Sequence, residues 1–308
     1  MILIEKTQIT GLEPTIRGMR NPMNSWAKSD SIFAEIGRDD THDLVGNFVG
    51  MGPLDKSDVD IGPNDLDLML RLARVGSVDG KFRRMIAVYV DITAPLYWWK
   101  EFDTYKVGTV ANSCSTMHKI HAKEFTLDDF SHEHLRGEGI VPDHDYQNGH
   151  DILCLTIDCL NYWREQYLEL SKIDDTAWKA APKSKGLTDE SLATAKKECW
   201  WQMIQLLPSS YNQKRTVMLN YEVLSNIYQH RRNHKLDEWR ELCKWIENLP
   251  YSEIITCNAT EKDKSNALTA AIAKLRAKQW SDDQIAEFLL EQAKLCDPPL
   301  QSQRLSHD

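Results

Sequence analysis

Three polar side chains in one stretch of the sequence could bind a polar ligand. Asn220, Asn226 and Arg231 fall within residues 216–231, where apolar residues recur at helical spacing and predict a helix. Buried amide and guanidinium groups need hydrogen-bond partners, which they find either inside the protein or in a ligand that carries carbonyl and phosphate groups. A uracil ring and a nucleotide phosphate would suit this trio, and the residues themselves support both alternatives equally.

A second group of reactive side chains lies in residues 94–120, which read APLYWWKEFDTYKVGTVANSCSTMHKI. Cys114 and His118 are four residues apart, so on a helix they would share one face and could act as a thiolate and its base. Cysteine is also a small apolar side chain that is common in protein cores. Spacing alone favours this second interpretation, a buried thiol.

Two clusters of histidines and acids could supply metal ligands. One contains His132, Glu133 and His134, and the other contains Asp143, His144, Asp145 and His150. Neither has the spacing of four residues that places two histidines on one face of a helix, so solvated loops are favoured over a metal site. The seven cysteines are scattered without a CxxC pair, which favours neither a disulfide framework nor a structural zinc site.

The composition is typical of a globular protein with one large core or two smaller ones. The chain has 308 residues and a net charge of −9, which argues against a general nucleic-acid binder but leaves room for a local basic pocket. There is no apolar run of about 18 residues that could span a bilayer. The first ten residues, MILIEKTQIT, contain an acid where the apolar core of a signal peptide should continue. We therefore expect a cytoplasmic protein that needs no membrane.

The elements that would position these residues can be predicted from local patterns. Residues 2–9 and 86–92 are rich in β-branched side chains and predict strands. Residues 11–31 are rich in turn formers and predict an irregular arm that carries Arg17 and Arg20. A helix is expected from Asn64 to Gly76, and a second one from Pro95 to near Gly108.

The second half of the chain predicts mostly helices. Residues 121–150 read as irregular, whereas 150–170 and 189–207 read as helices, the latter ended by Pro208. Leu236, Trp239, Leu242 and Ile246 form another apolar stripe at helical spacing, which predicts a helix over residues 236–246. A helix in the C-terminal tail has Ser281 and Gln284 as a capping box.

Two segments resemble the flavin-dependent thymidylate synthases (ThyX). The closer one is LLPSSYNQKRTVMLNYEVLSNIYQHR, residues 206–231. It is similar to the family's stretch in which Leu-Pro precedes a turn and a helix that ends in Leu-Arg. On that register Asn220, Asn226 and Arg231 match an asparagine, an asparagine and an arginine that serve the flavin, the pyrimidine and its phosphate.

The second segment resembles the family's signature in register rather than in residue identity. Family members have Ala-Pro, a helix with Arg-Gln, and then RHRxxSxNExSxRY, and Ala94-Pro95 aligns this pattern without a gap. The residues that then occupy motif positions are Lys100, Glu101, Thr104, Tyr105, Lys106, Thr109, Asn112, Cys114 and Thr116. Of the motif's three cations only Lys106 remains cationic, and a later family histidine is matched loosely by His234 or Lys235.

The resemblance covers roughly residues 64–118 and 200–245, and it implies an α/β fold of the α+β kind. We expect a twisted antiparallel sheet flanked by helices, with residues 1–250 as one domain, a helical insertion at about 121–199 and a helical C-terminal extension at 251–308. It also implies a homotetramer with active sites between subunits, FAD as cofactor, and transfer of a one-carbon unit from methylenetetrahydrofolate to dUMP, with NADPH reducing the flavin.

The resemblance assigns the site residue by residue. It implies cofactor binding by Lys106, Thr109, Asn220, Asn226 and His234, substrate binding by Glu101, Asn112, Asn226 and Arg231, and a catalytic role for Arg231. A separate catalytic candidate is Cys114, which stands where the family has a serine and could act as a thiolate nucleophile like that of the unrelated ordinary thymidylate synthases. Further candidates for binding phosphates or for stacking on a flavin are Arg83, Arg84, Tyr97, Trp98, Trp99 and Tyr105. Two alternatives remain open: a non-catalytic nucleotide-binding or assembly protein with this fold, and a different pyrimidine modification such as hydroxymethylation.

Overall fold

The computed structural model describes residues 1–33, 59–136, 148–173, 189–257, 281 and 284. The chain divides into two compact units, Met1–Thr256 and Cys257–Asp308. In the second unit, Ser281 and Gln284 exchange hydrogen bonds of 2.9 and 3.2 Å, which are those of the predicted capping box. Among the described residues no helix is long and apolar enough to cross a membrane. The predicted domain boundary near residue 250 stays a prediction.

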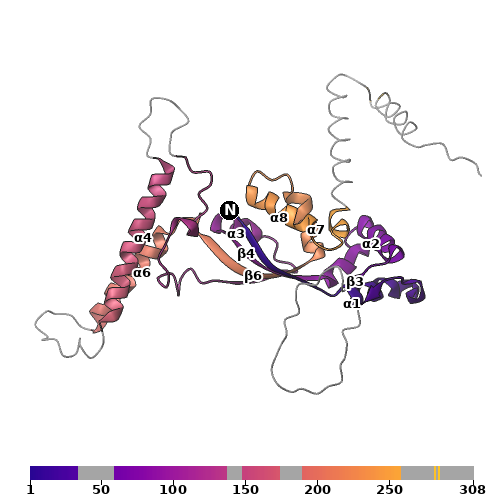
Figure 1. Cartoon of the computed structure of the whole chain (residues 1–308), viewed down its shortest axis with the longest axis horizontal. Helices are drawn as coiled ribbons and strands as arrows, with labels where there is room; N and C mark the ends of the chain where they lie inside the picture. Colours follow the sequence, from indigo (N-terminus) through magenta and orange to yellow (C-terminus); the bar gives the residue numbers. More distant parts are fainter. Residues whose placement is uncertain (34–58, 137–147, 174–188, 258–280, 282–283, 285–308) are drawn as a thin grey trace, which may run out of the picture. The chain divides into compact units, whose positions relative to one another are not determined.

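A four-stranded antiparallel sheet forms the centre of the first unit (Figure 1). Its strands are β1 (Leu3–Thr10), β4 (Ala87–Pro95), β6 (Asn212–Asn220) and β5 (Val110–Ser113), in the spatial order β1-β4-β6-β5. β2 (Ile32–Phe33) and β3 (Val59–Asp60) form a small separate pair. Helices flank the central sheet, so the predicted α+β class with an antiparallel sheet is confirmed.

The alternation of side chains gives the sheet one buried face. Val88, Val90 and Ile92 of β4 are fully buried, and the register places Val90 opposite the equally buried Val217 of β6. Tyr89 lies on the other face and is 43% exposed. This alternation between apolar and exposed positions is typical of an antiparallel sheet that is covered on one side.

The outer strand β1 contains an irregularity. Its register against β4 runs from Glu5 opposite Asp91 to Gln8 opposite Tyr89, so β1 has one residue more than β4 between these pairs. Lys6, inside this bulge, has a φ of 52°, which lies in the left-handed region.

The helices of the first unit agree with most of the predicted ones. They are α1 (Leu12–Arg20), α2 (Pro63–Val75), α3 (Leu96–Phe102), α4 (Gly149–Lys172), α6 (Asp189–Leu206), α7 (Tyr221–Arg231) and α8 (Asp237–Glu247). Short 3-10 turns span Asn21–Met23, Trp26–Lys28, Asp79–Met85 and Leu127–Asp129. The predicted strands at 2–9 and 86–92 and the predicted helices near 64–76, 150–170, 189–207 and 236–246 are confirmed with shifts of a few residues at their ends.

The predicted helix over residues 216–231 is wrong in its first part. Residues up to Asn220 belong to β6, which pairs with β4 over nine residues from Ala87 to Pro95. The helix begins at Tyr221 because the side chain of Asn220 accepts a hydrogen bond from the backbone N–H of Val223 at 3.0 Å, as an N-cap does.

The predicted irregular arm at residues 11–31 is also wrong in part, because its first half is α1. Leu12, Ile16 and Met19 bury one face of this helix. Most of the turn formers that suggested a loop lie after this helix, within residues 21–31. Gly11 precedes the helix with a φ of 93°, a conformation that favours glycine.

α3 ends six residues earlier than expected, at Phe102 rather than near Gly108. The residues after it form turns, in which the hydroxyl of Thr104 donates to the carbonyl oxygen of Glu101 at 2.7 Å. The segment 103–109 is therefore a loop that connects α3 with β5.

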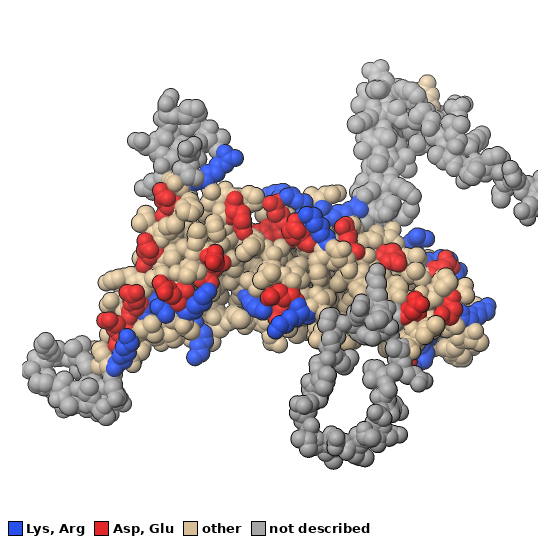
Figure 2. Space-filling view, in the orientation of Figure 1, with Lys and Arg blue, Asp and Glu red and all other residues tan. Residues whose placement is uncertain are grey.

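α4 and α6 pack against each other as a helical hairpin (Figure 1). Its buried core consists of Ile120, Phe125, Phe130, Leu153, Ile157, Leu160 and Met203. Hydrogen bonds from Trp200 to the carbonyl oxygen of Met117 and from Arg164 to that of His121 fix the hairpin to the preceding segment. On the face shown in Figure 2, positive and negative side chains are interspersed over the described elements.

Candidate functional site

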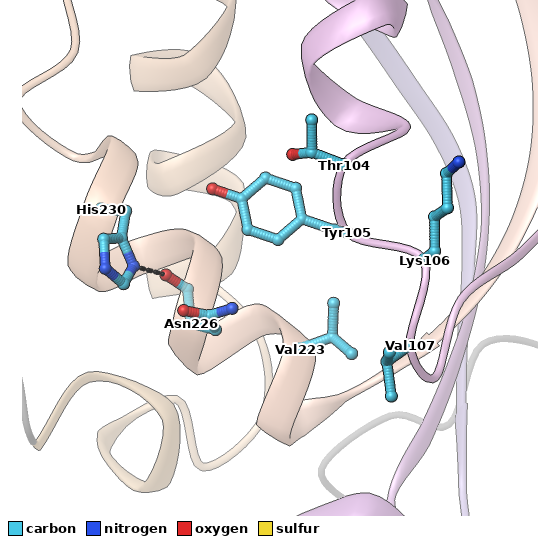
Figure 3. A pocket seen from close by; sticks show the side chains of 7 residues that line it. All are labelled: Thr104, Tyr105, Lys106, Val107, Val223, Asn226 and His230. Atoms are coloured by element: carbon cyan, nitrogen blue, oxygen red, sulfur yellow. Dashed lines mark hydrogen bonds between the residues drawn. The ribbon is translucent and has the colours of Figure 1, made fainter.

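A cavity of about 380 Å³ lies between the loop after α3 and helix α7 (Figure 3). The loop contributes Thr104, Tyr105, Lys106 and Val107, and α7 contributes Val223, Asn226 and His230. The cavity thus combines a cation, an amide and an aromatic ring with two valine side chains. Such a mixture of apolar walls and a few polar groups is typical of small-molecule sites.

The two walls of this cavity meet where the loop approaches the start of α7. Gly108 has a φ of 80°, and a Cβ atom at this position would lie 2.9 Å from Nδ2 of Asn220. The side-chain oxygen of the same Asn220 caps α7. The loop therefore passes close to the capping residue of α7, and only glycine at 108 allows this close approach.

A second cavity, of about 260 Å³, adjoins the first one. It is lined by Phe102, Asp103, Tyr105, Lys106, Thr109 and Ala111, so Tyr105 and Lys106 belong to both cavities. The hydroxyl oxygen of Thr109 is buried and has no hydrogen-bond partner among the described residues. Buried polar atoms in proteins are nearly always bonded, so this hydroxyl is suited to accept or donate a bond to a ligand.

Behind Tyr105, three groups converge on the carboxylate of Glu101. Its Oε2 atom accepts a hydrogen bond from Nε1 of Trp239 at 2.9 Å and lies 3.0 Å from Nη1 of Arg231. Nε2 of His234 is 3.6 Å from the same oxygen. The guanidinium group of Arg231 also lies over the ring of Trp239, 4.8 Å from its centroid, and donates from Nε to the hydroxyl of Tyr105 at 2.9 Å.

The structure brings most of the predicted site residues into this region. Lys106, Thr109 and Asn226 line the cavities, and Glu101, Arg231 and His234 form the cluster beside them. Asn220 lines neither cavity and lies at the start of α7 near Gly108, where its side-chain oxygen caps the helix. The roles toward ligands that the resemblance assigns to these residues stay predictions.

Asn112 and Cys114 line neither of the two cavities. Asn112 is on the exposed strand β5, opposite Thr216. Residues 114–118 are not helical, so the condition for pairing Cys114 with His118 is not met. The alternative prediction of a buried thiol is wrong too, because Cys114 is exposed.

Most of the aromatic residues in the 94–120 stretch are part of the core. Trp98 and Trp99 are fully buried, with their ring centroids 4.9 Å apart, and Trp98 packs on Trp239 at 4.8 Å. Tyr97 donates a hydrogen bond to the carboxylate of Glu238. Among these predicted rings, only Tyr105 lines a described cavity.

The two arginines of the segment before β4 serve the fold. Arg83 is buried, pairs with Glu222 at 2.7 Å and donates to the hydroxyl of Ser225 at 3.2 Å, which fixes the start of α7. Arg84 is exposed and donates to the carbonyl oxygen of Ser77 at 3.4 Å.

The described residues contain no group of three or more side chains that could hold a metal ion. His134 pairs with Asp237 at 3.0 Å, and Nδ1 of His150 lies 3.8 Å from the sulfur of Cys154. The acids and histidine at 143–145 lie outside the described residues.

No family model matches the sequence, and no curated protein matches it. The chain is similar in structure to solved flavin-dependent thymidylate synthases. One is ThyX from Helicobacter pylori complexed with FAD and dUMP, with 13% identity, a TM-score of 0.45, and coverage of 82% of this chain and 95% of that one. A second structure of ThyX from Helicobacter pylori, also with FAD and dUMP, has 12% identity, a TM-score of 0.45, and coverage of 82% and 94%.

The chain is also similar to a UMP/dUMP methylase, PolB from Streptomyces cacaoi, bound with 5-Br dUMP. The identity is 13%, the TM-score is 0.39, and the similarity covers 83% of this chain and 94% of that one. These likenesses concern the fold alone.

Proposed function

We propose that the protein is a flavin-dependent enzyme that modifies a pyrimidine nucleotide, with thymidylate synthesis as the specific reaction. The observation that carries this proposal is the pair of adjoining cavities. Asn226, the predicted pyrimidine ligand, lines the first, and Thr109, a predicted flavin ligand, lines the second. Two reactants bound in these cavities would be neighbours across Tyr105 and Lys106.

The first cavity suits a pyrimidine nucleotide. The side chain of Asn226 offers both a carbonyl oxygen and N–H donors, which match the alternating acceptors and donor of a uracil edge. Val107 and Val223 supply apolar surface for the ring. Lys106 supplies a positive charge for the phosphate, and its ammonium group can reach a ligand because it is exposed.

The second cavity suits the polar edge of a flavin ring. Phe102 and Tyr105 provide aromatic walls, and the unpaired hydroxyl of Thr109 and the ammonium group of Lys106 provide polar contacts. A flavin bound there would supply hydride transfer. The protein's own contribution is to orient the ring with Thr109 and to place it beside the first cavity.

In this proposal methylenetetrahydrofolate supplies the one-carbon unit, dUMP is converted to dTMP, and NADPH reduces the flavin. The purified full chain is expected to take up FAD and to convert dUMP to dTMP. The product is detected by mass spectrometry of the nucleotides after incubation with dUMP or dCMP, methylenetetrahydrofolate and NADPH. A product carrying another substituent would identify a different pyrimidine modification. Nucleotide binding without any product would favour a non-catalytic protein, and binding of neither FAD nor nucleotide would refute the proposal.

Substituting the ligand-facing residues tests the assignment directly. Lys106→Gln and Asn226→Ala are each expected to weaken dUMP binding about tenfold or more. Lys106→Gln loses a hydrogen bond to a charged group, which contributes about 1.5–3 kcal/mol, and Asn226→Ala loses the amide hydrogen bonds to the uracil ring. Isothermal titration of dUMP measures the effect. Lys119→Gln, an exposed lysine that lines neither cavity, is the matched control. Equal affinities for Lys106→Gln and Lys119→Gln would remove Lys106 from the site.

We also propose that the chain assembles with further copies of itself, as the resemblance to a homotetrameric family implies. A stripe on α4 supports this: Ile152, Leu155 and Tyr162 are 44%, 68% and 53% exposed, and the exposed Cys159 lies between them. Their spacing of three, four and three residues places them on one face of the helix. Such a contiguous exposed apolar face often marks a contact with another protein.

The assembly proposal predicts that Leu155→Glu lowers the particle mass measured by light scattering to half or less. A charged side chain in the stripe would have to be desolvated in a contact, so the contact would be lost while the circular dichroism stays unchanged. Glu190→Gln, at an exposed position of the other helix of the hairpin, α6, should leave the mass unaltered. An unaltered mass for Leu155→Glu would show that this stripe is not a subunit contact.

A further inference from the structure

Tyr105 and Arg231 occupy different places relative to the cavities. Tyr105 lines both cavities, and Figure 3 shows its ring between the loop after α3 and helix α7. Arg231 lines neither of them. Its Nε atom instead donates a hydrogen bond of 2.9 Å to the hydroxyl of Tyr105. Arg231 therefore touches the cavities only through this tyrosine.

Two further parts of the Arg231 side chain contact the protein. Nη1 pairs with Oε2 of Glu101 at 3.0 Å, so a carboxylate already balances the positive charge. One face of the guanidinium group lies on the ring of Trp239, whose own N–H is bonded to the same Glu101 oxygen. A planar guanidinium group has several donors in fixed directions, so it can bind a carboxylate and a hydroxyl at the same time in one defined arrangement, which a lysine cannot reproduce.

We propose that Arg231 is a positioning residue that fixes Tyr105 as the common wall of the two cavities, with Glu101 and Trp239 holding Arg231 in turn. The phosphate role that the resemblance assigns to Arg231 then falls to Lys106, a cation that lines both cavities. The consequence for binding rests on the proposed function, because it supposes that the first cavity receives a nucleotide.

Charge and geometry can be separated with one conservative substitution. Arg231→Lys keeps the positive charge and can still meet Glu101, but it cannot also hold the hydroxyl of Tyr105 in the same arrangement. A phosphate-binding cation would tolerate this change in large part. A positioning arginine would not, and the loss would be the same for dUMP and for deoxyuridine, which has no phosphate.

The experiment is a double-substitution cycle by isothermal titration on the full chain. Wild type, Arg231→Lys, Tyr105→Phe and the double variant are titrated with dUMP and with deoxyuridine. We expect Arg231→Lys to weaken both ligands by a similar factor, of about tenfold, and to add nothing in the Tyr105→Phe background. Full affinity in Arg231→Lys, an effect on dUMP alone, or multiplied effects in the double variant would each overturn the inference.

A second measurement needs no nucleotide. Fluorotyrosine placed at position 105 gives a fluorine NMR signal that reports on the surroundings of this ring. Arg231→Lys is expected to shift or broaden the signal, whereas Arg71→Lys, whose arginine pairs with Asp67 on α2, should leave it in place. An unchanged signal in Arg231→Lys would contradict the coupling. If wild type binds no nucleotide, the proposed function fails. The fluorine NMR measurement still tests whether Arg231 positions Tyr105.

Discussion

Asp65→Ala is expected to lower the free energy of unfolding by roughly 3–5 kcal/mol, the usual cost of breaking a buried ion pair by removing one partner. Asp65 has no exposed surface, and its Oδ1 atom lies 2.6 Å from Nε of Arg20, which is itself almost fully buried. Removing the carboxylate leaves that guanidinium group buried without its counter-charge. Chemical denaturation monitored by circular dichroism measures the change.

The same carboxylate also organises the chain between α1 and α2. Its Oδ2 atom accepts hydrogen bonds from the hydroxyls of Ser29 and Ser31, each at 2.6 Å, and from the backbone N–H groups of residues 30 and 31 at 3.2 Å. The control is Asp67→Ala, two residues along the same helix. Asp67 pairs with Arg71 at the exposed surface, so its loss should cost less than about 0.5 kcal/mol. Similar losses for the two variants would contradict the assigned role of Asp65.

Acidification should expose the contribution of Asp65 in a second way. Burial would raise the pKa of this carboxyl, but hydrogen bonds from Ser29, Ser31 and Arg20, together with the charge of Arg20, outweigh burial, and the pKa lies below its ordinary value. Its stabilisation is therefore complete above the unfolded-state pKa of about 3.9 and is lost as the pH falls through the lower folded-state pKa. The stability difference between wild type and Asp65→Asn should shrink over that range.

Gly11→Ala is expected to be the other severe substitution. A Cβ atom at this position would overlap the backbone carbonyl oxygen of Met85, and a backbone atom cannot move aside as a side chain can. The φ of 93° adds a conformational cost of about 1–2 kcal/mol, and overpacking adds roughly 1–3 kcal/mol. Thermal and chemical denaturation measure the loss.

Gly76→Ala is the matched control for Gly11→Ala. Gly76 also has a positive φ, of 136°, but a Cβ atom there would meet nothing within 4 Å. It should therefore show the conformational cost alone. If Gly11→Ala is no worse than Gly76→Ala, the contact between the start of α1 and Met85 does not constrain the fold as described.

The elements that could be predicted from the sequence are those whose pattern is strong within the element itself. The strand at 86–92, IAVYVDI, is rich in β-branched residues, and the stripe with Trp239, Leu242 and Ile246 does bury one face of α8. In these segments the local conformational preference and the tertiary packing favour the same structure, so the local sequence pattern is sufficient to predict the element.

The elements that could not be predicted depend on partners far away in the sequence. Residues 216–220 have apolar spacing that fits a helix, but the nine-residue pairing of β6 with β4 decides in favour of a strand. At the start of α1, Gly11 was read as a turn former, although its carbonyl oxygen accepts the backbone N–H of Thr15 and opens the helix. The sequence around residue 11 does not contain this information.

The same limit applies to the candidate site. The family register predicted Lys106, Thr109 and Asn226, and these residues do line the two cavities. It gave no indication of Trp239, which lies 138 residues after its partner Glu101 and was predicted only as part of an apolar stripe. A pattern within one helix cannot show which carboxylate an indole N–H will meet.

The bulge in β1 restricts how the central sheet could grow. β1 is an outer strand, and the extra residue between Glu5 and Gln8, with Lys6 in a left-handed conformation, interrupts the straight row of backbone groups that an incoming strand would need. At the opposite edge, β5 offers only the four residues Val110–Ser113. Continuous strand addition is therefore disfavoured at both borders, which protects the chain from edge-to-edge aggregation and leaves side-chain surfaces as the means by which it would meet a partner.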